Sequence, residues 1–387
     1  MSPLTSPSTP ASSQPTSPQI LKGSLICYRL FDLGDEILLD QAEGRLAGGE
    51  GPRRLRLSRT GTQALSLTVP PLDVDLGSRT LALPRWAPMP AQVSARLFDY
   101  GCVSVRFELA IPPGTTLADM IPLCAELHDL PLLEREARQA LEGVLPRIQD
   151  AVVGGPMWAD LETYTLVYVQ DLEGQPTGEE VLERWGQDIC KLLQAEVSPQ
   201  PLAEREVQEM RRNAHSYLEQ DLVVVDWGSA LVIEPSGSRD IPDVLELACA
   251  HLTGLRSYDD HLDREMVRIY DQVEQAARPK LSWDRYGKLA SQVQERWLDL
   301  TEYNERMENT IKIVGDLYLA RVYSEALERF RVPLWRNSVY RKQRQVAQVY
   351  EFLQGEMYSR RSILLETTIV ALIVLEIILA FVPGLLH

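Results

Sequence analysis

The apolar stretch from Ser362 to Val382, SILLETTIVALIVLEIILAFV, constrains the fold more than any other part of the sequence. Its length of about 21 residues is enough for a helix to cross the hydrocarbon core of a bilayer. Arg360 and Arg361 stand directly before it, and the positive-inside rule therefore predicts that the bulk of the chain is cytoplasmic. We expect a single-pass, tail-anchored membrane protein with membrane lipid as one partner. A buried core helix is the alternative interpretation.

Two glutamates interrupt this stretch. Glu366 lies near its start, where the carboxylate can reach the membrane interface. Glu376 lies deeper, where a charge costs several kcal/mol. A carboxylate at that depth pairs with a partner, takes up a proton or faces another protein segment. Glu376 is therefore either a side chain that extends to the far interface or a helix–helix contact in a homo-oligomer.

Charge and cysteine usage exclude several classes of function. The 387 residues carry a net charge of −16, so we expect no direct DNA binding, which needs clustered Lys and Arg. The five cysteines show no C-x-x-C spacing, which favours buried thiols in a reducing compartment over disulfides or zinc. His251 and His261 lie nearly three helical turns apart on one predicted helix. We expect neither a metal nor a cofactor.

The first 20 residues are rich in Ser, Thr and Pro and predict a disordered tail. They lack the apolar core of a secretory signal and the arginines of a mitochondrial transit peptide.

Residues 21–235 alternate between strand and helix patterns and predict an α+β domain. A helix is expected at Gly178–Gln194, where apolar residues recur on one face, and a β-hairpin at Asp221–Glu234. Strands rich in β-branched, aromatic and other apolar residues are expected at Gly23–Phe31, Arg96–Ile111 and Thr163–Val169. This order predicts a mixed sheet covered by helices on at least one side.

Residues 240–330 carry two heptad seams of apolar residues, separated by a break at Pro279. Each seam has one polar position, Asp259 in the first and Asn304 in the second. The seams mirror each other about Pro279, which predicts an antiparallel, coiled-coil-like helical hairpin with Asp259 opposite Asn304. A hydrogen bond between these side chains would fix the register. Alternatively, both side chains face solvent.

Pro333 begins a predicted juxtamembrane helix, residues 333–361, that leads into the apolar stretch at 362–382. Its first half is basic, and the residues concerned are Arg336, Arg341, Lys342 and Arg344. These side chains can contact anionic lipid or a partner. They can also pair with acidic residues of the hairpin, namely Asp259, Asp260, Asp263 and Glu265. We favour the pairing.

Three motifs carry a resemblance to a known family. They are LFDYGCV at residues 97–103, LRSYDDHLDRE at residues 255–265, and the glutamates Glu366 and Glu376 among the apolar residues of the last stretch. Together with the order of strands and helices they resemble the YagE family, also called the required-for-meiotic-nuclear-division family. The resemblance implies a membrane-bound, self-associating protein of unknown function. That family includes a mitochondrial inner-membrane member linked to translation and other members linked to cell or nuclear division.

This chain departs from the mitochondrial members of that family because it lacks a transit peptide. We therefore expect a bacterial plasma membrane, with the mitochondrial inner membrane as the alternative.

The sequence favours a non-catalytic, self-associating scaffold with an α+β recognition head. The conspicuous cluster Tyr258, Asp259, Asp260, Asp263, Arg264 and Glu265 fits helix packing and ion pairs or the binding of a partner protein. One alternative is an enzyme with a site between head and hairpin, using Asp99, Tyr100, Asp226, Trp227, Asp260 and His261. Another is a tether for ribosomes that acts through the basic residues 331–344.

Overall fold

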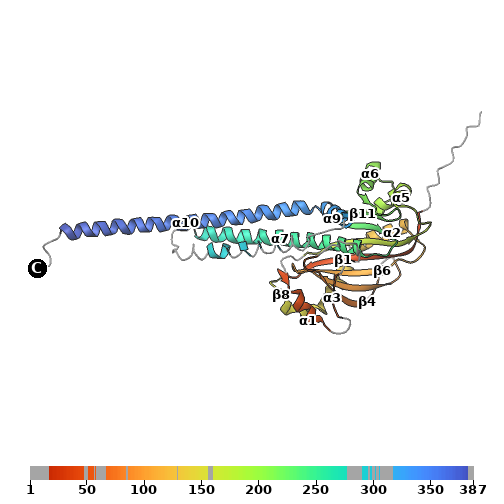
Figure 1. The fold of residues 1–387 in the computed structure, drawn as a ribbon, viewed down its shortest axis with the longest axis horizontal. Coiled ribbons are helices and arrows are strands. Elements are labelled where there is room, and N and C mark those ends of the chain that lie inside the picture. Colours follow the sequence, from red (N-terminus) through yellow and green to blue (C-terminus); the bar gives the residue numbers. More distant parts are fainter. Residues whose placement is uncertain are drawn as a thin grey trace, which may run out of the picture. The chain divides into compact units, whose positions relative to one another are not determined.

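The fold was analysed in a computed structural model (Figure 1). It describes residues 17–47, 51–55, 57, 67–83, 86–128, 130–155, 160–276, 290–294, 297–298, 301, 305 and 317–381. The chain divides into two compact units. Unit 1 comprises residues 1–254 and 310–332, and unit 2 comprises residues 255–309 and 333–387.

Unit 1 is built on a large mixed sheet with the strand order β10-β11-β12-β9-β1-β6-β5-β4-β3, and β7 pairs with β1 beside this path. The strands are β1 (Gln19–Asp32), β3 (Arg53–Arg54), β4 (Leu72–Leu81), β5 (Met89–Leu97), β6 (Cys102–Ala110), β7 (Thr115–Thr116), β9 (Glu162–Leu172), β10 (Ala214–His215), β11 (Leu222–Val225) and β12 (Ser229–Ile233). Among the described strands, β12 and β9 pair in parallel and the other neighbours pair antiparallel. A small second sheet joins β2 (Glu36–Ile37) to β8 (Val152–Val153).

The helices of the chain are α1 (Leu39–Leu46), α2 (Leu117–His128), α3 (Pro131–Glu142), α4 (Leu145–Ile148), the 3-10 helix η1 (Gln149–Ala151), α5 (Gly178–Leu193), α6 (Glu204–Arg212), α7 (Asp240–Ala276), α9 (Leu317–Arg329) and α10 (Val332–Phe381). Helix α5 begins with a capping box, in which the Thr177 hydroxyl accepts from the Glu180 N–H and the Glu180 carboxylate accepts from the Thr177 N–H. The predicted mixed α+β fold with a long C-terminal helix is therefore confirmed.

Helices cover both faces of the large sheet. On β1, Leu25, Cys27 and Phe31 point into a core shared with α2, α3 and α5. Successive side chains of a strand alternate between faces, so Tyr28 lies on the other face, where its hydroxyl donates to the Pro242 carbonyl of α7 at 3.3 Å. Double coverage explains why β1 is buried without interruption from Leu25 to its end.

A buried ionic network holds the start of α7 against the sheet. Arg96 of β5, only 3% exposed, forms two hydrogen bonds to Asp73 of β4, with Nε–Oδ1 at 2.7 Å and Nη2–Oδ2 at 3.0 Å. Its Nη1 lies 2.9 Å from Asp243 Oδ1 and 2.8 Å from Glu246 Oε2, both on α7. Burial raises the pKa of the Glu246 carboxyl, which Arg96 and Arg106 oppose. The guanidinium therefore compensates carboxylates that would be costly to bury alone.

The five cysteines lie buried in unit 1 as free thiols, in agreement with the prediction of buried thiols. Burial raises the pKa of each, for example to about 11 for Cys190. At neutral pH these groups are thiols and pack as small apolar side chains.

In unit 2, the second half of α7 runs along α10. Val339, Val346 and Leu353 of α10 are buried at heptad spacing. Lys342 Nζ of α10 lies 2.9 Å from Asp259 Oδ1 and 2.6 Å from Asp263 Oδ1 of α7. The predicted pairing of the basic helix with the acidic hairpin residues is thus confirmed for Lys342. Asn304, the predicted partner of Asp259, and the turn at Pro279 lie outside the described residues.

The expected membrane anchor at residues 362–382 is wrong. Across the described residues, we find no helix with the length and apolarity that a membrane crossing requires. The prediction gave the length of the apolar run more importance than the charged residues within it. Glu366 and Glu376 fall within this run, and each carries a cost of several kcal/mol in a bilayer core. The prediction of a single-pass membrane location is withdrawn with it.

We expect the Arg96→Met variant to lose about 3–5 kcal/mol of unfolding free energy, because Asp243 and Glu246 stay buried without their nearest cation. The matched control is Arg79→Met on β4, whose pair with Glu136 is partly exposed at 28% and 23%, and about 0–1 kcal/mol is expected there. Urea unfolding of the full chain, followed by tryptophan fluorescence, measures both. Equal losses in the two variants would contradict a stabilising role for the network.

The pair of Asp259 and Lys342, whose side chains are 11% and 13% exposed, is expected to couple α7 to α10. In a double-mutant cycle, Asp259→Asn and Lys342→Met should each cost about 2 kcal/mol and together less than the sum. The control Arg264→Gln removes a half-exposed pair with Asp260 and should change stability by less than about 0.5 kcal/mol. Additive losses, measured from circular dichroism melts, would rule out the coupling.

Candidate functional site

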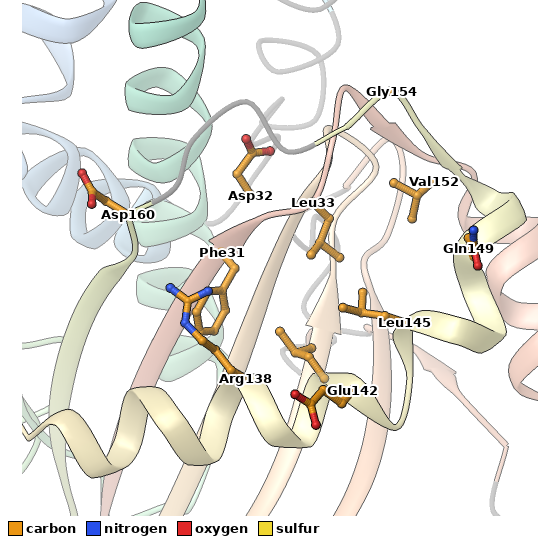
Figure 2. Close-up of a pocket in the computed structure, with 11 residues that line it drawn as sticks. Phe31, Asp32, Leu33, Arg138, Glu142, Leu145, Gln149, Val152, Gly154 and Asp160 are labelled. Atoms are coloured by element: carbon orange, nitrogen blue, oxygen red, sulfur yellow. The ribbon is translucent and has the colours of Figure 1, made fainter.

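One candidate site in unit 1 is a cavity of about 600 Å³ where β1 ends. Figure 2 shows the residues that line it, which come from the end of β1, from α3, α4, η1 and β8, and from the segment before β9. These segments are far apart in the sequence, and the sheet brings them together because β9 pairs with β1.

The turn after β1 shapes the upper wall of the cavity. The Leu33 N–H donates to the Gly101 carbonyl at 2.9 Å, and the Gly34 N–H donates to Asp32 Oδ1 at 3.2 Å. Gly101 has a φ of +83°, and a Cβ there would lie 1.7 Å from the Gly34 carbonyl oxygen. Only glycine fits this close approach, which fixes the direction in which Asp32 and Leu33 leave the strand.

The described lining of the cavity combines apolar and charged side chains. Its apolar side chains are those of Phe31, Leu33, Leu141, Leu145 and Val152. The ionisable residues of the lining are Asp32, Arg138, Glu142 and Asp160. The Arg138 guanidinium lies 5.0 Å from the centroid of the Phe31 ring and pairs with Glu134 on the same helix at 2.9 Å. Three carboxylates and one guanidinium thus belong to the part of the lining that the structure describes.

A second hollow of about 680 Å³ in unit 1 contains two residues that the sequence singled out. Asp226 and Trp227 form the turn between β11 and β12, and the hollow is lined by Asn213, Asp226, Trp227, Glu325, Glu328, Arg329 and Arg331. Trp227 is 47% exposed. Burial raises the pKa of the Asp226 carboxyl, although its hydrogen bond with the Trp227 backbone opposes this. The hollow offers an aromatic face between charges of both signs.

The described lining of this hollow does not include the other residues of the enzyme interpretation. Asp99 and Tyr100 are buried in the turn between β5 and β6, where the Asp99 carbonyl accepts from the Ile37 N–H at 2.9 Å. Asp260 and His261 belong to unit 2, whereas Asp226 belongs to unit 1. Within the described part of the chain, no cluster of His, Cys, Asp or Glu is arranged to hold a metal ion.

The cluster at residues 258–265 takes part in helix packing within unit 2. Tyr258 is buried and its hydroxyl accepts from Gln343 Nε2 of α10 at 3.1 Å. Asp259 and Asp263 hold Lys342. Arg264 pairs with Asp260 one turn before it at 3.0 Å, and the buried Glu265 pairs with Arg268.

The last part of α10 presents apolar side chains on all sides. Each is between 49% and 59% exposed, and they are Ile363, Leu364, Leu365, Ile369, Val370, Leu372, Ile373, Val374, Leu375, Ile377 and Ile378. We call this the apolar segment of α10. Glu366 and Glu376 are exposed within it. The Glu366 carboxylate accepts from the Ser362 hydroxyl at 3.4 Å.

Sequence reasoning identified the apolar segment and the 258–265 cluster but missed the cavity. Its lining residues are of ordinary types and are scattered from Phe31 to Asp160. No spacing in the sequence links them, so only the strand pairing could reveal the site.

Comparison with known proteins places unit 1 in a family. The model of the family described as "Uncharacterized protein MJ0711, N-terminal domain" matches residues 22–239, and α7 begins at the next residue. Uncharacterized protein MJ0711 of Methanocaldococcus jannaschii is 28% identical over 193 residues, which cover 50% of this chain and 58% of that protein. The match therefore spans little more than half of that relative. No solved structure matches the chain.

The predicted membership of the YagE family is wrong, since these comparisons support the MJ0711 family instead. The three motifs behind the resemblance were short and rested partly on helix positions that packing explains, such as Tyr258 and Asp259. More than half of the chain matches one family model, and the chain belongs to the family of the N-terminal domain of uncharacterized protein MJ0711.

Proposed function

We propose that this protein is a non-catalytic scaffold that self-associates through the apolar segment of α10 and presents its α+β unit for recognition. The observation that carries the proposal is the exposure of this segment, in which apolar side chains face every direction around the helix. A helix that is apolar all round is normally buried. Contiguous exposed apolar patches beyond a few hundred Å² mark interaction surfaces.

Burial of this segment would release considerable free energy. Removing a Leu, Ile or Val side chain from water stabilises by about 1.5–3 kcal/mol when burial is complete. Every copy of the chain carries the same segment, so a symmetric assembly brings identical apolar surfaces together. A single helix–helix contact covers only one stripe of a helix. We therefore propose a bundle of more than two α10 helices, which covers more of the circumference.

Glu366 and Glu376 are the ionisable residues in the apolar segment. In helical assemblies a single polar side chain at an apolar interface selects the register and the number of helices, at a cost in stability. We assign this role to Glu376, because apolar residues flank it on both sides at Leu375 and Ile377.

The predicted antiparallel hairpin of residues 240–330 is part of the proposal, as the element that carries α10. Helix α7 supplies its first half, and residues 290–294 are helical. The Tyr350 hydroxyl of α10 donates to Gln294 Oε1 at 3.3 Å. The interpretations as a ribosome tether and as an enzyme stay predictions.

Substitution of Ile373 by lysine should dissociate the assembly, because a charge replaces an apolar side chain at the proposed interface. The Thr367→Lys chain is the matched control, since it adds the same charge to the same helix at a position that is already polar. Mass photometry of the full chain should show a discrete oligomer for the wild type and the control, and monomer for Ile373→Lys. A monomeric wild type, or an unchanged mass for Ile373→Lys, would refute self-association through α10.

The Glu376→Leu chain should still associate, and more tightly, but with a different or mixed number of copies because the polar position no longer selects the register. Native mass spectrometry resolves the copy number directly. The corresponding change at Glu366, which lies near the start of the apolar segment, serves as the comparison and should leave the copy number unaltered. If the Glu376→Leu assembly has the wild-type copy number, Glu376 does not set the register.

A further inference from the structure

We propose that assembly of the α10 helices takes up protons at Glu376, so that acidification strengthens self-association. This inference rests on the proposed self-association through the apolar segment of α10, and it names the chemical signal to which that association responds. It requires parallel α10 helices, as in a ring with cyclic symmetry, in which the same residue of every copy lies at the same level.

Glu376 stands alone among the apolar residues of α10. Its side chain is exposed and makes no hydrogen bond or ion pair with another described residue. The sequence has no other ionisable residue between positions 367 and 386. Glu366 lies ten residues earlier on α10, which corresponds to about 15 Å along the helix axis. Along the described part of α10, no cation is therefore close enough to compensate the Glu376 carboxylate.

Association changes the surroundings of this carboxylate in two ways. Apolar side chains of the neighbouring copies remove it from water, and the Glu376 side chains of those copies approach it at the same level. Leu372 and Ile373, one turn before it on the same helix, are 59% and 49% exposed and are available for this contact. Burial and a nearby like charge both favour the neutral form of a carboxyl group.

The groups that face Glu376 in a parallel bundle are the Glu376 side chains of the other copies. Two ionised carboxylates can only accept hydrogen bonds, whereas a protonated carboxyl group donates one. Proton uptake therefore replaces a repulsion between copies by a hydrogen bond between them.

The direction of the pH dependence follows from the number of bound protons. The assembly binds more protons than the separate chains do, so a fall in pH favours association. The effect ends near pH 4.3, roughly where the carboxyl groups of separate chains also take up protons. Antiparallel helices give the opposite sign where they place Arg361 of one copy beside Glu376 of another, because acid then removes an ion pair.

Sedimentation equilibrium of the full chain measures the association constant as a function of pH. Between about pH 8 and about pH 6, the wild-type constant should rise at least about tenfold per pH unit, which corresponds to one proton or more per assembly. The Glu376→Gln chain keeps a polar side chain that does not titrate, and most of this dependence should be lost.

The matched control is Glu351→Gln, which removes an exposed carboxylate of α10 outside the apolar segment. It should keep the wild-type dependence. This control also accounts for the net charge of −16, because loss of that charge in acid reduces repulsion between whole chains in all three proteins.

The outcomes separate this inference from the proposed function. A wild type that is monomeric at every pH overturns both. A wild-type assembly with the same pH dependence as Glu376→Gln overturns only the proton uptake, and self-association stands. Association that weakens in acid also overturns it, since parallel helices do not give that sign.

Discussion

The buried guanidinium of Arg96 is the interaction on which the architecture of unit 1 depends. It joins Asp73 of the neighbouring strand to Asp243 and Glu246 of α7, so the same side chain ties two strands of the sheet to the helix that covers them. A charged group at this depth is tolerated because its donors meet carboxylates from three directions. With α7 held on one face, the large core of α2, α3 and α5 can form on the other.

The chain carries two surfaces with different chemistry, one in each compact unit. The cavity at the end of β1 is lined by apolar and charged side chains. The apolar segment of α10 lies in the other compact unit and consists of side chains that are about half exposed. The matched family model ends at residue 239, one residue before α7 begins. The cavity thus lies within the part of the chain that the family model covers, and the apolar segment lies outside it.

Sequence patterns predicted the positions of several strands and helices, but they did not predict which faces of these elements are buried. Alternating and β-branched stretches identified the strands around Tyr28, Arg106 and Tyr164, because strand residues show a period of two. The same rule could not foresee that helices cover both faces of β1. Heptad spacing indicated helical packing of residues 240–276, yet the partner of Asp259 among the described residues is Lys342, which lies on a helix more than 80 residues away. The membrane anchor failed because the length of an apolar run was weighed above the charges within it.

What the sequence by itself determined is the α+β class, the long C-terminal helix and the apolar segment within it, since these follow from the local order of apolar and polar residues. Only the tertiary structure decided which distant side chains meet. The antiparallel pairing of β1 with β9, and the packing of α3 against β1, bring Asp32, Arg138 and Asp160 to one cavity. Arg96 of β5 likewise reaches Glu246 only because α7 packs on the sheet. Local sequence patterns do not predict such contacts. The free energy that selects these contacts comes from packing between helices and strands, and not from interactions within one helix or strand.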